Sequence, residues 1–354
     1  MLSRLTFRQV YLLLAVALAG AVVMSAAIGD FIFTPRAMVR FVGQALHLVP
    51  LTAADALDRN VFFKLRLPRV LLGTVTGAVL GVSGTLMQGL FRNPIVEPGL
   101  AGTSAGAAFG AALVFVLGGH ATLAFTAPLG SAAVPVLAFA GGFAATVLVY
   151  RVSTSFGKVN VFTMLLAGIA VNAVCAAGTG FLSYIARDPQ ARNITFWNLG
   201  TFTTADWPGA LLVTATFLIC CVFAFRYGKA LNALMLGEDE AAYTGLDPRR
   251  FTWGLLVVNT LMVAVATAMV GVIAFIGLVV PHLLRMLRSS DYTFLLPASA
   301  LLGAVLMEVI DTVARLVIAP AELPIGIITA VVGAPIFIWI LMRQQRRGAA
   351  GYFG

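Results

Sequence analysis

The feature that most constrains this chain is the length of its apolar segments. Residues 251–284 contain no Asp, Glu, Lys or Arg across 34 consecutive positions, and several other apolar runs are close to the length of a membrane span. A helix needs about 20 apolar residues to cross the hydrocarbon core of a bilayer. Membrane β-barrels instead use alternating strands of roughly 10 residues. We therefore predict an all-α polytopic membrane protein, with residues 1–354 forming one transmembrane domain.

Charge is scarce, at 10% of residues against 60% hydrophobic residues, whereas soluble domains average about 25% charge. The net charge of +9 could suggest a nucleic-acid partner. However, Lys and Arg lie at the ends of apolar segments, and no basic stripe with interleaved aromatic residues is present. We expect no nucleic-acid binding. The cysteines Cys175, Cys220 and Cys221 lie inside apolar runs and form neither a CxxC motif nor a disulfide framework.

Charged residues and prolines divide the chain into ten candidate spans. The run 251–284 is too long for one helix, and its glycines and Pro281 supply breaks, so we expect two helices separated near "GVIAFIG". An even number of spans places both basic termini on one face. That face carries 14 of the 23 Lys and Arg residues, so we expect it to be cytoplasmic. The other predicted spans are 10–29, 70–90, 100–118, 130–150, 161–185, 208–226, 295–314 and 324–342.

One dense polar cluster interrupts this apolar chain, "LGEDEAAYTGLDPRR" at residues 236–250. Two adjacent spans can be joined by a handful of residues, yet we expect the cytoplasmic segment here to cover residues 228–250. A solvated loop with helix-capping acids is one interpretation. The alternative is a docking element, in which a short helix lays an apolar face into the groove of a partner.

Four stretches resemble the iron-siderophore, haem and cobalamin permeases, the membrane subunits of type II ATP-binding-cassette importers. The polar cluster is similar to the coupling loop of that family. The other three stretches cover much of the region from residue 64 to 342 in the order of the family: "KLRLPRVLLGTVTGAVLGVSGTLMQGLFRNPIVEPGLAGTSAGAAFGAAL", "GVIAFIGLVVPHLLR" and "ELPIGIITAVVGAPIFIWIL".

The resemblance implies about ten spans per subunit and a homodimer with a central translocation pathway. It also implies two separate cytoplasmic ATPase subunits, which bind ATP, and a periplasmic binding protein. The chain has no GxxxxGK[ST] motif, so we expect it not to be an enzyme and to hold no cofactor of its own. The residues expected to couple it to the ATPase are Gly237, Glu238, Asp239, Ala241, Ala242, Gly245 and Leu246.

Arginines that match the docking positions of the family lie in the predicted outer part of the chain. Arg66 and Arg69 are three residues apart before the second span, and Arg315 follows Asp311 near the end of another. The resemblance implies that these three arginines receive acidic side chains of the binding protein. An arginine fork suits carboxylate recognition because it can pair through two nitrogen atoms. Alternatively, the arginines pair with a local acid such as Asp311.

The resemblance also implies a cytoplasmic gate at Asn93, Ile95, Val161 and Phe162. Val161 and Phe162 replace the small polar residues that some family members have there, so the constriction is expected to be more apolar. Glu97 is expected in the cytoplasmic turn. Glu308 lies inside a span, where a charge is costly unless it is paired or hydrated, and the sequence suggests no role for it.

The outer loop "ARDPQARNITFWNLGTFTTADW" is the best indication of the substrate. Arg187, Arg192, Phe196 and Trp197 are expected near the mouth of the pathway as substrate-access residues. Aromatic walls and arginine edges suit haem, a flat apolar ring with two carboxylates. "ITFWNLGTF" resembles haem permeases more than cobalamin permeases, so haem is the expected cargo. A ferric siderophore or cobalamin remains the alternative within the family, and we assign no histidine as a haem ligand.

Two other classes of protein fit the composition. A channel would need neither an ATPase partner nor a docking loop. A membrane anchor of a redox complex would be expected to carry paired intramembrane histidines, and only His282 approaches that description. The expected location is the inner membrane of a bacterium.

Overall fold

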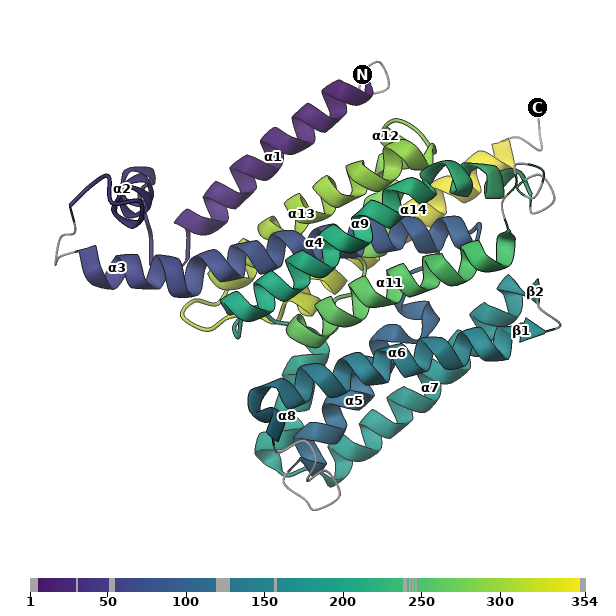
Figure 1. The fold of residues 1–354 in the computed structure, drawn as a ribbon, viewed down its shortest axis with the longest axis horizontal. Coiled ribbons are helices and arrows are strands. Elements are labelled where there is room, and N and C mark those ends of the chain that lie inside the picture. Colours follow the sequence, from purple (N-terminus) through teal and green to yellow (C-terminus); the bar gives the residue numbers. More distant parts are fainter. Residues whose placement is uncertain are drawn as a thin grey trace.

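The structure is a computed structural model that describes residues 6–29, 31–50, 55–118, 128–155, 158–237 and 247–350, together with Ala241, Tyr243 and Gly245. Helices dominate this part of the chain (Figure 1), and one antiparallel pair of two-residue strands, β1 (Thr154–Ser155) and β2 (Lys158–Val159), accompanies them. In chain order, the helices are α1 (Phe7–Ala27), α2 (Pro35–Ala45), α3 (Ala56–Val61), η3 (Phe62–Arg66), α4 (Leu67–Leu90), η4 (Pro98–Ala101), α5 (Thr103–Leu117), α6 (Ala133–Ser153), α7 (Val161–Ile185), α8 (Asp188–Leu199), α9 (Trp207–Leu236), α11 (Pro248–Val270), α12 (Ile276–Leu287), α13 (Tyr292–Leu316) and α14 (Ile325–Ala350).

The centre of the bundle is α4, which continues α3 and η3 into one helix of 35 residues. In its apolar stretch, 89% of residues are buried, and α4 packs against α13, α9, α12 and α11. The π-helical turn η3 shifts the helical register immediately before Pro68. Such turns often occur at functional sites, and this one lies between Phe62 and Arg66.

Glycines bring the backbones of α4 and α13 into direct contact. A Cβ atom built on Gly77 would collide with the carbonyl oxygen of Gly303, and one on Gly303 would collide with that of Gly77. Gly84 lies equally close to the backbone of Gly277 in α12. Small residues allow this approach between helices in a bilayer.

The predicted number of spans agrees with the helices. Within the described residues, seven helices are long and apolar enough to cross a membrane, and three shorter apolar helices accompany them. The predicted division of residues 251–284 is confirmed, because α11 ends at Val270 and α12 begins at Ile276. Gly271, with a φ of +77°, ends the first helix, and Phe275, with a φ of +68°, precedes the second.

Helices α5 to α8 form a separate layer beside the group built around α4 (Figure 1). Within this layer, α7 has 11% of its apolar stretch buried, against 33% for the span that contains α6 and 89% for the central helix α4. A long apolar helix left open in this way must face lipid or another protein.

We call the two ends of the bundle the arginine end, where Arg66 lies, and the coupling end, where Gly237 lies. Figure 1 shows that α1 begins and α14 finishes at the coupling end, so both terminal helices lead to one face of the molecule.

Three segments differ from the expectation. The segment predicted to be a loop from residue 228 is helical as far as Leu236, because α9 continues and buries Leu231 and Leu234. Two presumed outer loops contain helices, α2 and α8. Each of these has a proline in its first turn, a position that suits proline because the missing N–H has no helical partner there.

Candidate functional site

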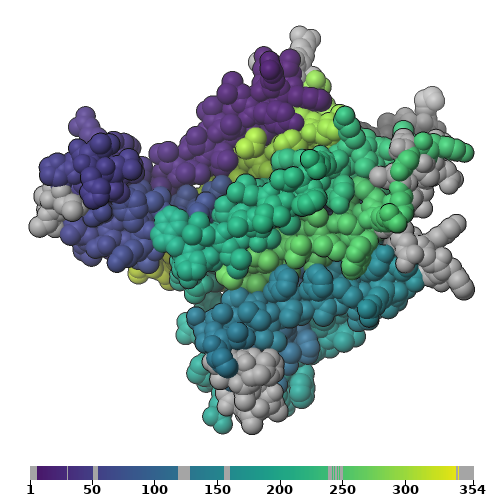
Figure 2. Space-filling view, in the orientation of Figure 1, coloured from purple at the N-terminus to yellow at the C-terminus, as the bar shows by residue number. Residues whose placement is uncertain are grey.

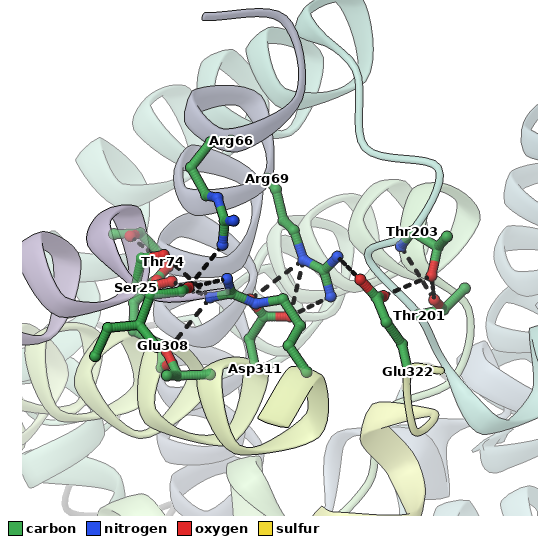
Figure 3. A network of polar contacts seen from close by, with 12 residues as sticks. Ser25, Arg66, Arg69, Thr74, Thr201, Thr203, Glu308, Asp311 and Glu322 are labelled. Carbon is green, nitrogen blue, oxygen red and sulfur yellow. Dashed lines mark hydrogen bonds and ion pairs between the residues drawn. The ribbon is translucent and has the colours of Figure 1, made fainter. Parts of the chain in front are cut away.

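The three arginines expected to dock a binding protein come together in one cluster at the arginine end, because they share contacts with Asp311 and with the carbonyl oxygen of Ile28. Figure 3 shows Arg66 and Arg69 within it. Arg66 and Arg69 extend from η3 and α4, and Arg315 extends from the last turn of α13. Their side chains turn into the protein. Arg66 is 8% exposed, and the side chains of Arg69 and Arg315 are 12% and 3% exposed. We call these three residues and their partners the arginine cluster.

Two acids pair with Arg69. Its Nη2 lies 2.8 Å from Oδ1 of Asp311, and its Nη1 lies 2.7 Å from Oε1 of Glu322. Arg315 binds the same Asp311 through Nε at 3.0 Å. The local partner considered from the sequence is therefore present for both arginines. Burial raises the pKa of Glu322, but its hydrogen bond to Arg69 and the charge of Arg69 outweigh this, so its pKa lies below the ordinary value.

The other arginine contacts close the end of α1. Nη1 of Arg66 donates to the carbonyl oxygen of Ile28 at 2.7 Å, and Arg315 donates to the same oxygen. Arg315 also donates to Oγ of Ser25 at 2.9 Å. Ile28 is the C-cap of α1, where carbonyl groups lack helical partners and the helix dipole favours positive charge. The cluster therefore ties α1, α4 and α13 together.

Glu308 lies one turn before Asp311 on α13 and is 1% exposed. Its Oε1 accepts a hydrogen bond from Oγ1 of Thr74 at 2.9 Å. Its Oε2 has no hydrogen-bond partner among the described residues. Unlike Asp311, Glu308 makes no direct ion pair within the described part of the chain. Glu308 is therefore buried beside the arginine cluster with only one of its two carboxyl oxygens hydrogen-bonded to a described residue.

The coupling segment is described in part. Gly237 ends α9, and Ala241 is fully buried, with its N–H donating to the carbonyl oxygen of Gly237 at 3.0 Å. Gly245 is exposed and has a φ of +81°. Tyr243, which the sequence did not single out, is 87% exposed. The other predicted coupling residues lie outside the described residues: Glu238, Asp239, Ala242 and Leu246.

The predicted gate residues have different environments. Oδ1 of Asn93 accepts the N–H of Ile95 at 3.0 Å, which fixes the turn after α4. Ile95 and Phe162 are 43% and 69% exposed. Val161, in contrast, packs against the main core. Ile95 and Phe162 are thus the two apolar gate candidates whose side chains are exposed.

A buried acid near this turn was not assigned a role from the sequence. Glu97 precedes η4, and its Oε1 accepts the N–H of Phe275 at 3.0 Å. Phe275 occupies the strained position between α11 and α12. Burial raises the pKa of Glu97, and the hydrogen bond from Phe275 lowers it by less. Glu97 therefore tethers the loop after α4 to the break between α11 and α12.

The substrate-access residues lie on or beside α8. Arg187 and Arg192 are exposed, and the guanidinium carbon of Arg192 lies 5.4 Å from the ring centre of Phe196. Phe196 is 42% exposed. Trp197 points elsewhere, because it packs against the alanines of α5, α6 and α11. Of the two adjacent aromatic residues, Phe196 is therefore exposed and Trp197 is packed inside the protein.

A cavity of about 580 Å³ lies between the α5–α8 layer and the break after α11. Its lining is rich in small and polar groups, including Glu97, Ser104, Asn172, Thr179 and Asn198. This is large enough for part of a sizeable organic ligand. Asn172 is held by a hydrogen bond from its Nδ2 to the carbonyl oxygen of Gly99 at 3.1 Å.

Comparison with known proteins identifies the relatives of this chain. It is 42% identical to the hemin transport system permease protein HmuU of Yersinia pestis over 290 residues, covering 81% of this chain and 85% of that protein. It is 40% identical to the vitamin B12 import system permease protein BtuC of Salmonella typhimurium over 291 residues, covering 80% and 84% of the two chains.

Solved structures show the same architecture. An inward-facing conformation of a putative metal-chelate type ABC transporter aligns with a TM-score of 0.79 and 29% identity, covering 95% of this chain and 99% of that one. PsaBC from Streptococcus pneumoniae shares the fold with a TM-score of 0.56 and 17% identity. The profile of the FecCD transport family matches residues 11–343. The chain therefore belongs to the FecCD transport family and is a permease subunit of an ATP-binding-cassette importer.

Proposed function

We propose that this permease moves haem from the periplasm to the cytoplasm across the inner membrane of a bacterium, with both termini in the cytoplasm. The observation that carries the proposal is the 42% identity to a hemin permease over 81% of the chain. The exposed pair of Arg192 and Phe196 supports it, since an aromatic ring and a guanidinium group suit a planar ligand with carboxylates. Vitamin B12 is the second candidate, because the B12 permeases are nearly as similar.

The working unit in this proposal is a homodimer with a central pathway. The open helix α7 supports it, with 11% of its apolar stretch buried in a single copy. The cavity lined by Glu97, Asn172 and Asn198 borders the same layer. A second copy against α7 would enclose a pathway between the two subunits, and Ile95 and Phe162 would narrow it on the cytoplasmic side.

Energy in this proposal comes from two separate ATPase subunits that bind at the coupling end and hydrolyse ATP. Tyr243 is the residue that best fits such a contact, because it presents an aromatic ring with 87% of its surface exposed. Aromatic residues of this kind often dominate binding energy at interfaces. Buried Ala241 and the left-handed Gly245 would hold the segment in shape on either side of it.

A periplasmic binding protein would dock at the arginine end. Of the three expected arginines, Arg69 has the most accessible side chain, at 12% exposed, and Arg315 the least, at 3%. We therefore assign direct contact to Arg69, where an acid of the binding protein would compete with Glu322. Arg66 and Arg315 would act by holding the docking surface in place through Ile28.

Transport in proteoliposomes tests the substrate. The permease is reconstituted with its ATPase and binding protein, and ATP-driven uptake of haem is compared with uptake of cobalamin and a ferric siderophore. Haem uptake that falls several-fold in Arg192→Gln and in Phe196→Ala, but not in the nearby Thr195→Ala, would agree with the proposal. Preferential uptake of cobalamin would refute haem as the substrate and favour vitamin B12, the second candidate.

A further inference from the structure

Helix α2 runs across the direction of the membrane spans instead of along it. In Figure 1, α1, α4 and α9 extend across the picture, whereas α2 is seen almost end-on at the arginine end. Figure 2 shows the α2–α3 region standing out from this end of the molecule, on the side of α1 and away from α7. The position is just beyond Ile28 and Arg66, where α1 ends and α4 begins. A helix that runs across the spans is oriented parallel to the plane of the membrane that they cross.

An aromatic cluster fixes α2 in this orientation. Phe41 of α2 lies 5.9 Å from Phe33 and 5.8 Å from Phe62, measured between ring centres, and Phe63 continues the cluster. Phe41 is 1% exposed. Beyond the rings, the amide of Gln44 donates to Asp55 at 3.0 Å and so joins α2 to the start of α3. The inner face of α2 is thus packed, and the direction of its outer face is set.

That outer face is apolar and uncovered within the described part of the chain. Val39, Val42 and Leu46 follow at spacings of three and four residues, which places them on one stripe of the helix, and they are 74%, 44% and 63% exposed. Arg36 and Arg40, four residues apart, line the edge of the stripe and are both exposed. Arg40 pairs with Asp55 at 2.8 Å and keeps half of its side chain open. Arg36 makes no ion pair with any described residue.

We propose that α2 is an interfacial helix whose stripe enters the acyl region of the outer leaflet and whose arginines bind the phosphates of anionic phospholipids. An apolar stripe bordered by basic residues is the pattern of helices that lie in a membrane interface. The neighbouring helix α1 already exposes apolar residues such as Leu12 and Val16 along its length, so the lipid-facing surface continues from α1 to α2. The positive edge of α2 is complementary to anionic headgroups rather than to neutral ones.

Spin labels test the depth of the stripe. In a chain in which Cys175, Cys220 and Cys221 are changed to alanine, labels are placed at Val39→Cys and Val42→Cys. Val16→Cys provides a lipid-facing reference and Tyr243→Cys an aqueous one. The permease is reconstituted in vesicles of phosphatidylcholine with and without phosphatidylglycerol, and collisions with oxygen and with a water-soluble nickel chelate are measured.

We expect the two α2 labels to collide more with oxygen than with the nickel chelate, as the label at Val16 does. Nickel accessibility equal to that at Tyr243 would show that α2 lies in water and would overturn the proposal. Loss of collisions with both reagents when the binding protein is added would show that a protein, not lipid, covers the stripe, and would also overturn it. None of these outcomes depends on which substrate is transported.

The headgroup preference is tested by the lipids retained on the purified permease, measured by native mass spectrometry. Arg36→Gln is expected to lower the ratio of bound phosphatidylglycerol to phosphatidylcholine by about fivefold, the effect of one basic residue near an anionic surface. Arg36→Lys should keep the ratio, because it keeps the charge. Lys64→Gln, which removes an exposed charge outside α2, should change it less. An unchanged ratio in Arg36→Gln would refute the phosphate contact.

Discussion

Asp311 is the residue on which the arginine cluster most depends, so Asp311→Asn is the sharpest test of what holds this end of the bundle together. Its carboxylate accepts from Nε and Nη2 of Arg69, at 3.1 and 2.8 Å, and from Nε of Arg315 at 3.0 Å. It is 2% exposed. The substitution keeps the size of the side chain but removes the charge and leaves two buried guanidinium groups with too little negative charge.

The expected loss follows from that geometry. Removing one member of a buried ion pair costs about 3–5 kcal/mol, chiefly because the remaining charge is left uncompensated. Since each 1.4 kcal/mol changes an equilibrium constant tenfold, such a loss would raise the unfolded population by a factor on the order of a thousand. Part of the loss should fall on the packing of α1. Asp311 holds the side chain of Arg315 in place, and Arg315 in turn donates to Ser25 and Ile28 of the α1 end.

Glu308→Gln provides the matched control. Glu308 lies on the same helix, one turn away, and is just as buried, but its Oε2 lacks a partner among the described residues. Replacing it by an amide of similar size breaks no ion pair within the described part of the chain, so its effect on stability should be small. A double-mutant cycle should give a coupling energy of about 2 kcal/mol between Arg69 and Asp311 and a smaller one between Arg69 and Glu308.

The assay is unfolding in mixed detergent–lipid micelles, followed by the loss of helical signal and by heat inactivation of reconstituted transport. If Asp311→Asn proves no less stable than Glu308→Gln, the cluster does not hold the helices together and the argument fails. A loss confined to binding-protein stimulation, with stability unchanged, would instead assign the cluster to docking.

Three further predictions concern other parts of the chain. Tyr243→Ala should reduce stimulation of the ATPase by about tenfold or more, as expected for an exposed aromatic anchor. Leu12→Ala, which removes an exposed side chain on the lipid-facing side of α1, should not, and equal effects would contradict the coupling role. Glu97→Gln should keep the fold but weaken the acceptor for the N–H of Phe275, so that ATP hydrolysed per substrate transported rises, and Glu97→Asp should restore part of the coupling. Glu322 has a lowered pKa in the fold, so its stabilising effect is complete above the ordinary pKa of 4.5 and is lost as the pH falls through the lower folded value; Glu322→Gln should therefore flatten the stability profile at acidic pH.

The spans could be predicted from the sequence because their cause is local. A continuous apolar run must be buried in lipid or protein whatever its neighbours are, and the break near Gly271 is visible in the excess length of residues 251–284. The continuation of α9 as far as Leu236 was not predicted, for a physical reason. Arg226 and Lys229 mark the end of the apolar stretch, but α9 continues past them because Leu231 and Leu234 still have a core to enter.

The arginine cluster could be predicted only in part, because its acceptors are distant in sequence. The three arginines were identified by their match to the docking positions of the family, and Asp311 by its position one turn before Arg315. The carbonyl oxygen of Ile28 could not be predicted, since it lies 287 residues from Arg315 and belongs to the backbone, whose exposure depends on where α1 ends. The helix α2 had a readable signal in Thr34 and Pro35, a capping residue followed by a first-turn proline. At 11 residues, α2 is too short to be recognised as a membrane span, so the sequence predicts a loop in its place.

The packing also indicates how a movement at the coupling end would spread. The segment after Gly237 joins α9 to α11, and both of these helices pack on α4. The arginine cluster ties α4 to α1 and α13 at the opposite end. The α5–α8 layer meets it mainly through α11, with the hydrogen bond from Phe275 to Glu97 spanning the boundary beside the cavity. A displacement of α11 would therefore reach the cavity through this tether, which links the coupling end to the boundary between the two groups.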